Sequence, residues 1–157
     1  MSTAPTTEAK TQSTRVAIIG SGFGGLAMAI RLLQANIHDF IILEKADDVG
    51  GTWRENQYPG AACDVQSHMY SLSFAPKTDW SKRYAEAPEI FDYIQDLIQQ
   101  FNLKKYIQFN QEVVSTRYDE HNFNWHLTLK SGQKIEAQFV IFASGPLHVA
   151  QIPKIKG

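Results

Sequence analysis

The stretch RVAIIGSGFGG, from Arg15 to Gly25, decides the fold of this chain. Its apolar part, residues 16–19, has the length of a buried strand, and apolar residues recur at helical spacing after the glycines. A strand, Gly-x-Gly-x-x-Gly and a helix, in this order, are typical of a dinucleotide-binding unit. Gly20 permits the tight turn, Gly22 lets the backbone approach a pyrophosphate, and Gly25 lets the helix pack closely on the strand. The free amides at the helix N-terminus favour an anion at the same place.

A second apolar run, FIIL at residues 40–43, predicts a parallel strand that is covered on both faces. Glu44 follows this run, 19 positions after Gly25 (44 − 25), where an acidic residue meets the ribose in such units. A carboxylate there would repel a 2′-phosphate, so the nucleotide expected at this place is FAD or NAD, and not NADP. The alternative is that Glu44 ends the strand in solvent and holds no ligand.

The rest of the chain extends the pattern to an α/β, Rossmann-like FAD-binding domain. Residues 45–87 lack periodicity but are rich in Gly, Pro, Trp and Tyr, and so long an ordered excursion usually has a function, here to wrap a cofactor larger than NAD. Residues 87–101 predict a helix with an apolar core face, and residues 106–109 a short strand. Alternation over residues 113–135 predicts two or three antiparallel strands. The unbroken run 139–142 predicts a last strand buried in the parallel sheet, so the antiparallel β-meander is inserted before that strand.

Composition sets limits on the partners and the compartment. The 157 residues carry 15 Lys plus Arg against 16 Asp plus Glu, so no charge excess points to nucleic acid or an anionic membrane. No apolar run approaches the length of a membrane span. The single cysteine, Cys63, excludes an intrachain disulfide and favours a reducing compartment, so we expect a cytoplasmic protein. The five histidines lack the spacing and companions of a metal site, and no metal is expected.

Three segments of different composition divide the chain. Residues 1–14 are rich in Ser and Thr without an apolar core, and we expect a disordered leader, with an organelle transit peptide as the alternative. Residues 15–150 form the predicted FAD-binding domain. Residues 151–157 predict the start of a linker to a further domain.

Three motifs together resemble the flavin-dependent class B monooxygenases of the Baeyer–Villiger type, over residues 15–157. The first is the glycine turn with Glu44, which many flavoproteins share. The second is more specific and consists of GGTW at residues 50–53, YPG at residues 58–60 and Cys63-Asp64. The third is Ala143-Ser144-Gly145, which is similar to an Ala-Thr-Gly element of the family and keeps a hydroxyl at the central position.

The resemblance implies an enzyme that uses FAD, NADPH and molecular oxygen to oxidise a ketone to an ester or lactone. It also implies a second domain for NADPH, a catalytic arginine and a signature Phe-x-Gly-x-x-x-His, and none of these three is found in the 157 residues. We therefore expect a truncated part of a longer enzyme that is inactive by itself. An NAD-dependent dehydrogenase domain and a non-catalytic flavin- or nucleotide-binding module remain as alternatives, although a dehydrogenase would leave the excursion unexplained.

The resemblance also implies which residues contact the cofactors. Lys45 and the backbone of Val113 would lie beside the adenosine, and Thr52, Trp53 and Tyr70 would line the flavin side. Asp64 is the candidate catalytic residue, expected as a buried carboxylate that a cation stabilises; the alternative is a locally satisfied Asx turn after Cys63. The full set of expected cofactor-binding residues is Gly20, Gly22, Phe23, Gly25, Glu44, Lys45, Gly51, Thr52, Trp53, Asp64, Tyr70, Val113, Ala143, Ser144 and Gly145.

Overall fold

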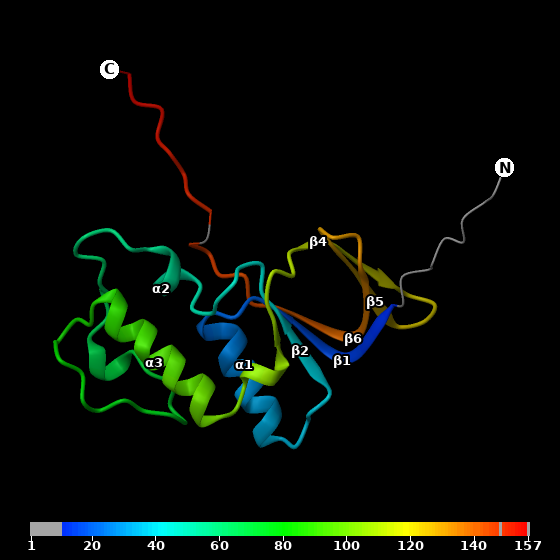
Figure 1. Ribbon diagram of the computed structural model, residues 1–157, viewed down its shortest axis with the longest axis horizontal. Coiled ribbons are helices and arrows are strands. Elements are labelled where there is room, and N and C mark those ends of the chain that lie inside the picture. The colour runs from blue at the N-terminus through cyan, green and yellow to red at the C-terminus, as the bar shows by residue number, and fades with distance from the viewer. Residues whose placement is uncertain (1–10, 148, 157) are drawn as a thin grey trace.

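The computed structural model describes residues 11–147 and 149–156, which form one six-stranded sheet with helices beside it (Figure 1). The order of the strands in the sheet is β3-β2-β1-β6-β5-β4. The strands are β1 (Gln12–Ile19), β2 (Phe40–Leu43), β3 (Ile107–Gln108), β4 (Val113–Asp119), β5 (Asn124–Leu129) and β6 (Lys134–Phe142). The helices are α1 (Phe23–Gln34), α2 (Thr52–Glu55) and α3 (Ala87–Gln100), with the short 3₁₀ turns η1 (Ser67–Met69) and η2 (Lys104–Tyr106).

The parallel part of the sheet consists of β3, β2, β1 and β6. β1 pairs in parallel with β2 and with β6, and β2 pairs in parallel with β3. Parallel strands need a crossover connection, and α1 supplies it between β1 and β2. The predicted Rossmann-like fold is therefore confirmed.

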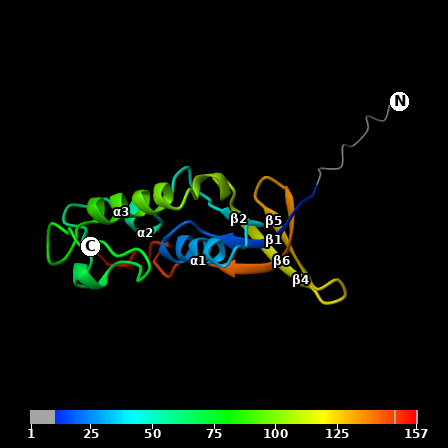
Figure 2. The same cartoon turned by 90° about the horizontal axis from the view of Figure 1, so that it is seen from below.

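Both long helices pack on one face of the sheet. The core on that face joins Val16, Ile18 and Ile42 of the strands to residues of α1 and α3. α3 begins with Pro88 in its first turn, which suits a helix start, and its apolar residues recur at helical spacing, as the sequence predicts. The two helices lie next to each other in Figures 1 and 2.

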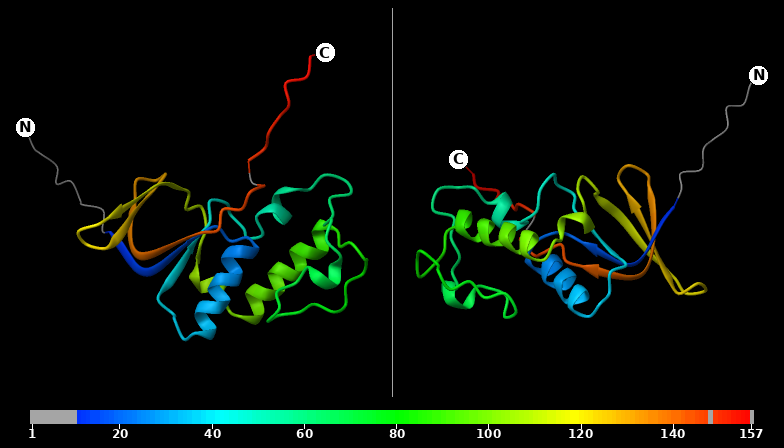
Figure 3. Two further views of the ribbon diagram at one scale, coloured as in Figure 1. Left: turned by 180° about the vertical axis from the view of Figure 1, so that it is seen from behind. Right: turned by 60° about the horizontal axis from the view of Figure 1, so that its bottom comes forward.

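The opposite face is covered by the antiparallel strands. Leu127 and Leu129 of β5 and Ile135 of β6 form a second core with Ala17 and Leu43. β6 serves both parts of the sheet, because its first half pairs with β5 and the whole strand follows β1. Figure 3 shows β6 in orange running beside β1 in blue. The antiparallel meander is therefore not a separate insertion before the last parallel strand. Its third strand is β6, which is also the last strand of the parallel part.

Two predictions from the sequence are wrong in part. Residues 139–142 were predicted to be buried, but Phe139 is 49% exposed and Phe142 is 60% exposed. In the described chain this half of β6 pairs only with β1, and its middle residues Val140 and Ile141 are half-buried while the two phenylalanines are exposed. The disordered leader was predicted to reach residue 14, whereas β1 already begins at Gln12. Residues 1–10 of that prediction lie outside the described residues.

Candidate dinucleotide-binding site

Two glycines of the turn after β1 are required by the packing of the protein itself. Gly20 has a φ of +102°, and a Cβ there would lie 2.6 Å from the carbonyl oxygen of Ala143. A Cβ on Gly25 would lie 2.0 Å from the carbonyl oxygen of Gly20. Any larger residue at these two positions would push α1 and β6 away from the turn.

Gly22 differs from the other two glycines of the motif, Gly20 and Gly25. It is the N-cap of α1 with φ −78° and ψ −170°, a conformation open to every residue, and no side chain caps the helix there. A Cβ on Gly22 would meet nothing closer than the Cα of Gly51, at 3.9 Å. The protein's own packing therefore does not demand glycine here. The space in front of this residue, at the amide end of α1, suits the close approach of a pyrophosphate.

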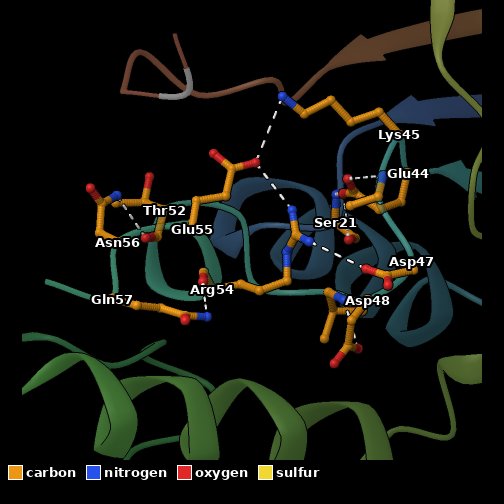
Figure 4. Close-up of polar contacts among 12 residues, drawn as sticks. Ser21, Glu44, Lys45, Asp47, Asp48, Thr52, Arg54, Glu55, Asn56 and Gln57 are labelled. Carbon is orange, nitrogen blue, oxygen red and sulfur yellow. Dashed lines mark hydrogen bonds and ion pairs between the residues drawn. The ribbon is translucent and has the colours of Figure 1, made fainter. Parts of the chain in front are cut away.

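Glu44 lies at the end of β2 and is buried, with 5% of its surface exposed. Its Oε2 accepts hydrogen bonds from the backbone N–H of Ser21 at 2.9 Å and from the Ser21 hydroxyl at 2.6 Å (Figure 4). Its Oε1 accepts a third bond from the backbone N–H of Ala46 at 3.0 Å. The carboxylate is thus held rigidly beside the glycine turn, and the alternative that it ends the strand in solvent is excluded.

The excursion after β2 folds back onto the glycine turn. The N–H of Gly50 donates to the carbonyl oxygen of Ser21 at 3.2 Å, and a Cβ on Gly51 would lie 3.4 Å from the Cα of Gly22. Gly50 has a φ of +110°, and a Cβ there would come within 2.8 Å of the Phe91 ring on α3. The two glycines of the GGTW motif therefore pack between the turn and α3. Thr52 and Trp53, the last two residues of the motif, begin the short helix α2.

Aromatic rings lie next to the start of α1. The rings of Phe23 and Tyr70 are in edge contact, with their centroids 5.3 Å apart. The ring centroids of Trp53 and Tyr70 are 5.7 Å apart, also in an edge arrangement. The indole N–H of Trp53 donates to the hydroxyl of Tyr70 at 3.0 Å. Burial raises the pKa of Tyr70 above its ordinary value, although the bond from Trp53 acts in the opposite direction. The phenol is thus neutral at physiological pH and accepts the indole hydrogen bond.

Asp64 does not have the buried position that we expected from the sequence. Its side chain is exposed, while the preceding Cys63 is buried against Ala85 and Ile90. The carboxylate of Asp64 therefore lies at the surface, next to a residue that is buried. Its charge reaches Tyr70, whose pKa it raises as a minor cause after burial.

A chain of ion pairs connects the end of β2 with α2 (Figure 4). Lys45 Nζ lies 3.7 Å from Glu55 Oε1, and the same oxygen lies 3.1 Å from a guanidinium nitrogen of Arg54. The other terminal guanidinium nitrogen of Arg54 lies 3.5 Å from Oδ1 of Asp47. These groups are partly exposed, so each pair adds little stability. They place the ammonium group of Lys45 between the strand end and α2.

The remaining expected residues lie on two sides of the turn. The backbone N–H of Glu44 donates to Gln108 and its carbonyl accepts from Gln111, so Val113, which starts β4, follows directly after this contact. Ala143 donates its N–H to Ile19 at 2.9 Å and packs against Gly20. Ser144 and Gly145 come next and are exposed. The fold thus gathers segments from β1, β2, α2 and the end of β6 around one turn.

Two cavities in the described chain lie outside this turn. One of about 400 Å³ lies between residues 53–61 and the start of α3, and one of about 520 Å³ lies at the opposite end of β1, against residues 122–124. Within residues 11–147 and 149–156, no group of three or more His, Cys, Asp or Glu could hold a metal ion, and no helix is long and apolar enough to cross a membrane.

Reasoning from the sequence missed the contribution of Ser21. Its hydroxyl and N–H provide two of the three hydrogen bonds to Glu44. The signal was available in principle, because Ile19 of β1 pairs with Leu43 of β2 and the residues after both strands must then meet at the same sheet edge. The rotamer that brings the hydroxyl onto the carboxylate was not available from the sequence.

Fold and site together define a Rossmann-like dinucleotide-binding domain. Residues 17–157 match the family described as pyridine nucleotide-disulphide oxidoreductase, and the chain belongs to this family.

Several monooxygenases are among the relatives and solved structures that this chain resembles. A Baeyer–Villiger monooxygenase of Streptomyces coelicolor is 43% identical over 143 residues, which are 91% of this chain and 27% of that protein. Cyclohexanone monooxygenase bound to ε-caprolactone superposes with a TM-score of 0.86 at 33% identity, over 94% of this chain and 30% of that one. OTEMO in complex with FAD and NADP superposes with a TM-score of 0.84 at 32% identity, over 94% of this chain and 29% of that one. The resemblance predicted from the motifs is confirmed, and the chain spans less than a third of the length of these proteins.

Proposed function

We propose that this chain is the FAD-binding part of an NADPH- and oxygen-dependent flavin monooxygenase of the Baeyer–Villiger type, which oxidises ketones to esters or lactones. The observation that carries the proposal is the free space in front of Gly22, at a helix N-terminus beside a buried carboxylate. The protein does not use this space itself, and a dinucleotide fits its chemistry. The presence of FAD and NADP in OTEMO supports the choice of cofactors, and cyclohexanone monooxygenase with its lactone supports the substrate class.

The proposed roles follow the position of each residue around the turn. The amides after Gly22 bind the pyrophosphate, and Glu44 accepts a hydrogen bond from the ribose. Lys45 and the backbone of Val113 lie on the adenosine side. Phe23, Gly51, Thr52, Trp53 and Tyr70 line the flavin side together with Ala143, Ser144 and Gly145.

FAD, when bound, supplies the redox chemistry, and the residues of this chain supply position and exclusion of water. Trp53 and Tyr70 are suited to that task, because a hydrogen bond and an edge contact join the two rings and Tyr70 also packs on Phe23. Asp64 is the proposed carboxylate near the flavin. Its exposure in this chain leaves it free to meet a cationic partner.

Titration with FAD and with NAD tests the proposal on the chain as it exists. Binding is followed by calorimetry and by quenching of tryptophan fluorescence, and FAD should bind more tightly because the GGTW segment closes on the turn. Tighter binding of NAD would favour a dehydrogenase domain, and no binding of either nucleotide would sink the assignment of this turn as a cofactor site. We also propose a cytoplasmic location, supported by the one cysteine, Cys63, whose thiol is free and buried.

A further inference from the structure

Ser21 is fully buried and lies between two glycines of the turn. Its hydroxyl and its N–H both donate to Oε2 of Glu44, at 2.6 and 2.9 Å (Figure 4). We propose that Ser21 is the positioning residue that orients the Glu44 carboxylate toward a single ribose hydroxyl and so determines recognition of an unphosphorylated adenosine ribose. The inference rests on the proposed function, in which this turn binds FAD.

The orientation follows from counting the acceptor positions of Glu44. A carboxylate has about four lone-pair sites on its two oxygens. Ser21 fills the two sites of Oε2, and the N–H of Ala46 fills one site of Oε1 at 3.0 Å. No further donor to the Glu44 carboxylate is found among the described residues, so one site remains, on Oε1. The protein therefore leaves room for one hydroxyl donor, and a 2′-phosphate, which brings further negative charge and no such hydroxyl, has no partner there.

The hydroxyl of Ser21 is the part of this arrangement that a side chain contributes. The backbone N–H would still bind Oε2 in an alanine variant, so the turn itself does not depend on the hydroxyl. Without it, Oε2 regains a free acceptor site and the carboxylate can turn, so the site on Oε1 is no longer singled out. Ser21 thus acts through Glu44 and need not touch the nucleotide.

The test compares FAD with its analogue that carries 2′-deoxyribose on the adenosine side, using calorimetry on the wild type and on Ser21→Ala. In the wild type, removal of the 2′-hydroxyl should weaken binding about 10- to 100-fold, as for a hydrogen bond to a charged group. In Ser21→Ala the same removal should weaken binding by about threefold or less. Glu44→Gln should reduce the ratio in the same way.

Ser67→Ala is the matched control. Ser67 is also buried, and its hydroxyl donates at 2.6 Å to the carbonyl oxygen of Lys82, away from the glycine turn. Its variant should keep the wild-type ratio of the two affinities. Because each ratio is measured within one variant, a general loss of stability cancels. If Ser21→Ala does not fold, Ser21→Cys keeps the size and offers only a weak donor, and its ratio should fall too.

The outcomes separate the two proposals. A wild type that binds FAD, together with an unchanged ratio in Ser21→Ala, would overturn the role of Ser21 and leave the FAD site standing. Equal weakening of both ligands in that variant would also overturn it, since this indicates a structural role alone. A wild type that binds no FAD would overturn the proposed function itself.

Discussion

Replacing Gly22 with alanine separates what the protein needs from what its ligand needs. A methyl group at this position would lie no closer than 3.9 Å to any described residue beyond its two chain neighbours, and φ −78° suits alanine. Glycine is a better N-cap than alanine, so we expect a loss of about 1 kcal/mol or less in the free energy of unfolding. The fold should therefore survive the substitution.

The same methyl group would occupy the place where the backbone approaches a pyrophosphate. Forcing one extra methyl into a packed contact costs about 1–3 kcal/mol. That range corresponds to about a 5- to 150-fold weaker affinity for FAD. Titration calorimetry measures the affinity, and thermal unfolding without FAD measures the stability of the same sample.

Gly24→Ala provides the matched control for this substitution. Gly24 lies two residues further along, in the first turn of α1, is exposed, and would place its methyl group 3.8 Å from the Cβ of Ala143. In a helix the change should stabilise the chain by about 0.5–1 kcal/mol and leave FAD binding unchanged. Wild-type affinity in Gly22→Ala, or an equal loss of affinity in both variants, would refute the reasoning.

Three further predictions concern stability. A Cβ on Gly25 would lie 2.0 Å from a backbone carbonyl oxygen, so Gly25→Ala should destabilise the fold by more than about 3 kcal/mol, seen as a lost or strongly lowered thermal transition. Leu127→Ala, at a fully buried site, should cost about 2–5 kcal/mol in urea unfolding, whereas Phe142→Ala, at a site 60% exposed, should cost less than about 1 kcal/mol. Hydrogen bonds from the side chain and backbone of Asn122 lower the pKa of Asp119 from 3.8 to about 2. Its stabilising contribution is therefore complete above pH 4 and disappears as the pH falls through 2, so the difference in melting temperature between wild type and Asp119→Asn should vanish over that range; a constant difference would contradict this assignment.

The local elements of the fold could be predicted because their signals are short-range. The strand at β2 is bounded by its apolar run, and α3 by Pro88 and its apolar spacing. The glycine turn could be recognised from its residue types and short spacing, although the contact that requires Gly20 is with Ala143, far along the chain. The exposure of Phe142 could not be foreseen, since an unbroken apolar run does not reveal whether anything covers it.

Asp64 shows the same limit at the candidate site. Its motif places it one residue after a buried cysteine, which suggested burial for the carboxylate too. Neighbouring residues in an irregular loop point in different directions, however, and no periodicity indicates which of them faces the core. The excursion after β2 is held by contacts between distant segments, such as Gly50 with Ser21 and with Phe91, and these decide which side chains are left at the surface.

The sequence by itself determined that a strand, three glycines and a helix form a turn able to bind a dinucleotide, and that an acidic residue stands at the end of the next strand. These statements depend on residue types and short spacings, which act through local geometry. Only the tertiary structure decided that Gly22 alone among the three faces free space, and that Ser21 holds Glu44 with one acceptor site left open. Both facts arise where β1, β2 and the excursion meet, and the position of an atom in such a contact depends on segments far apart in the chain.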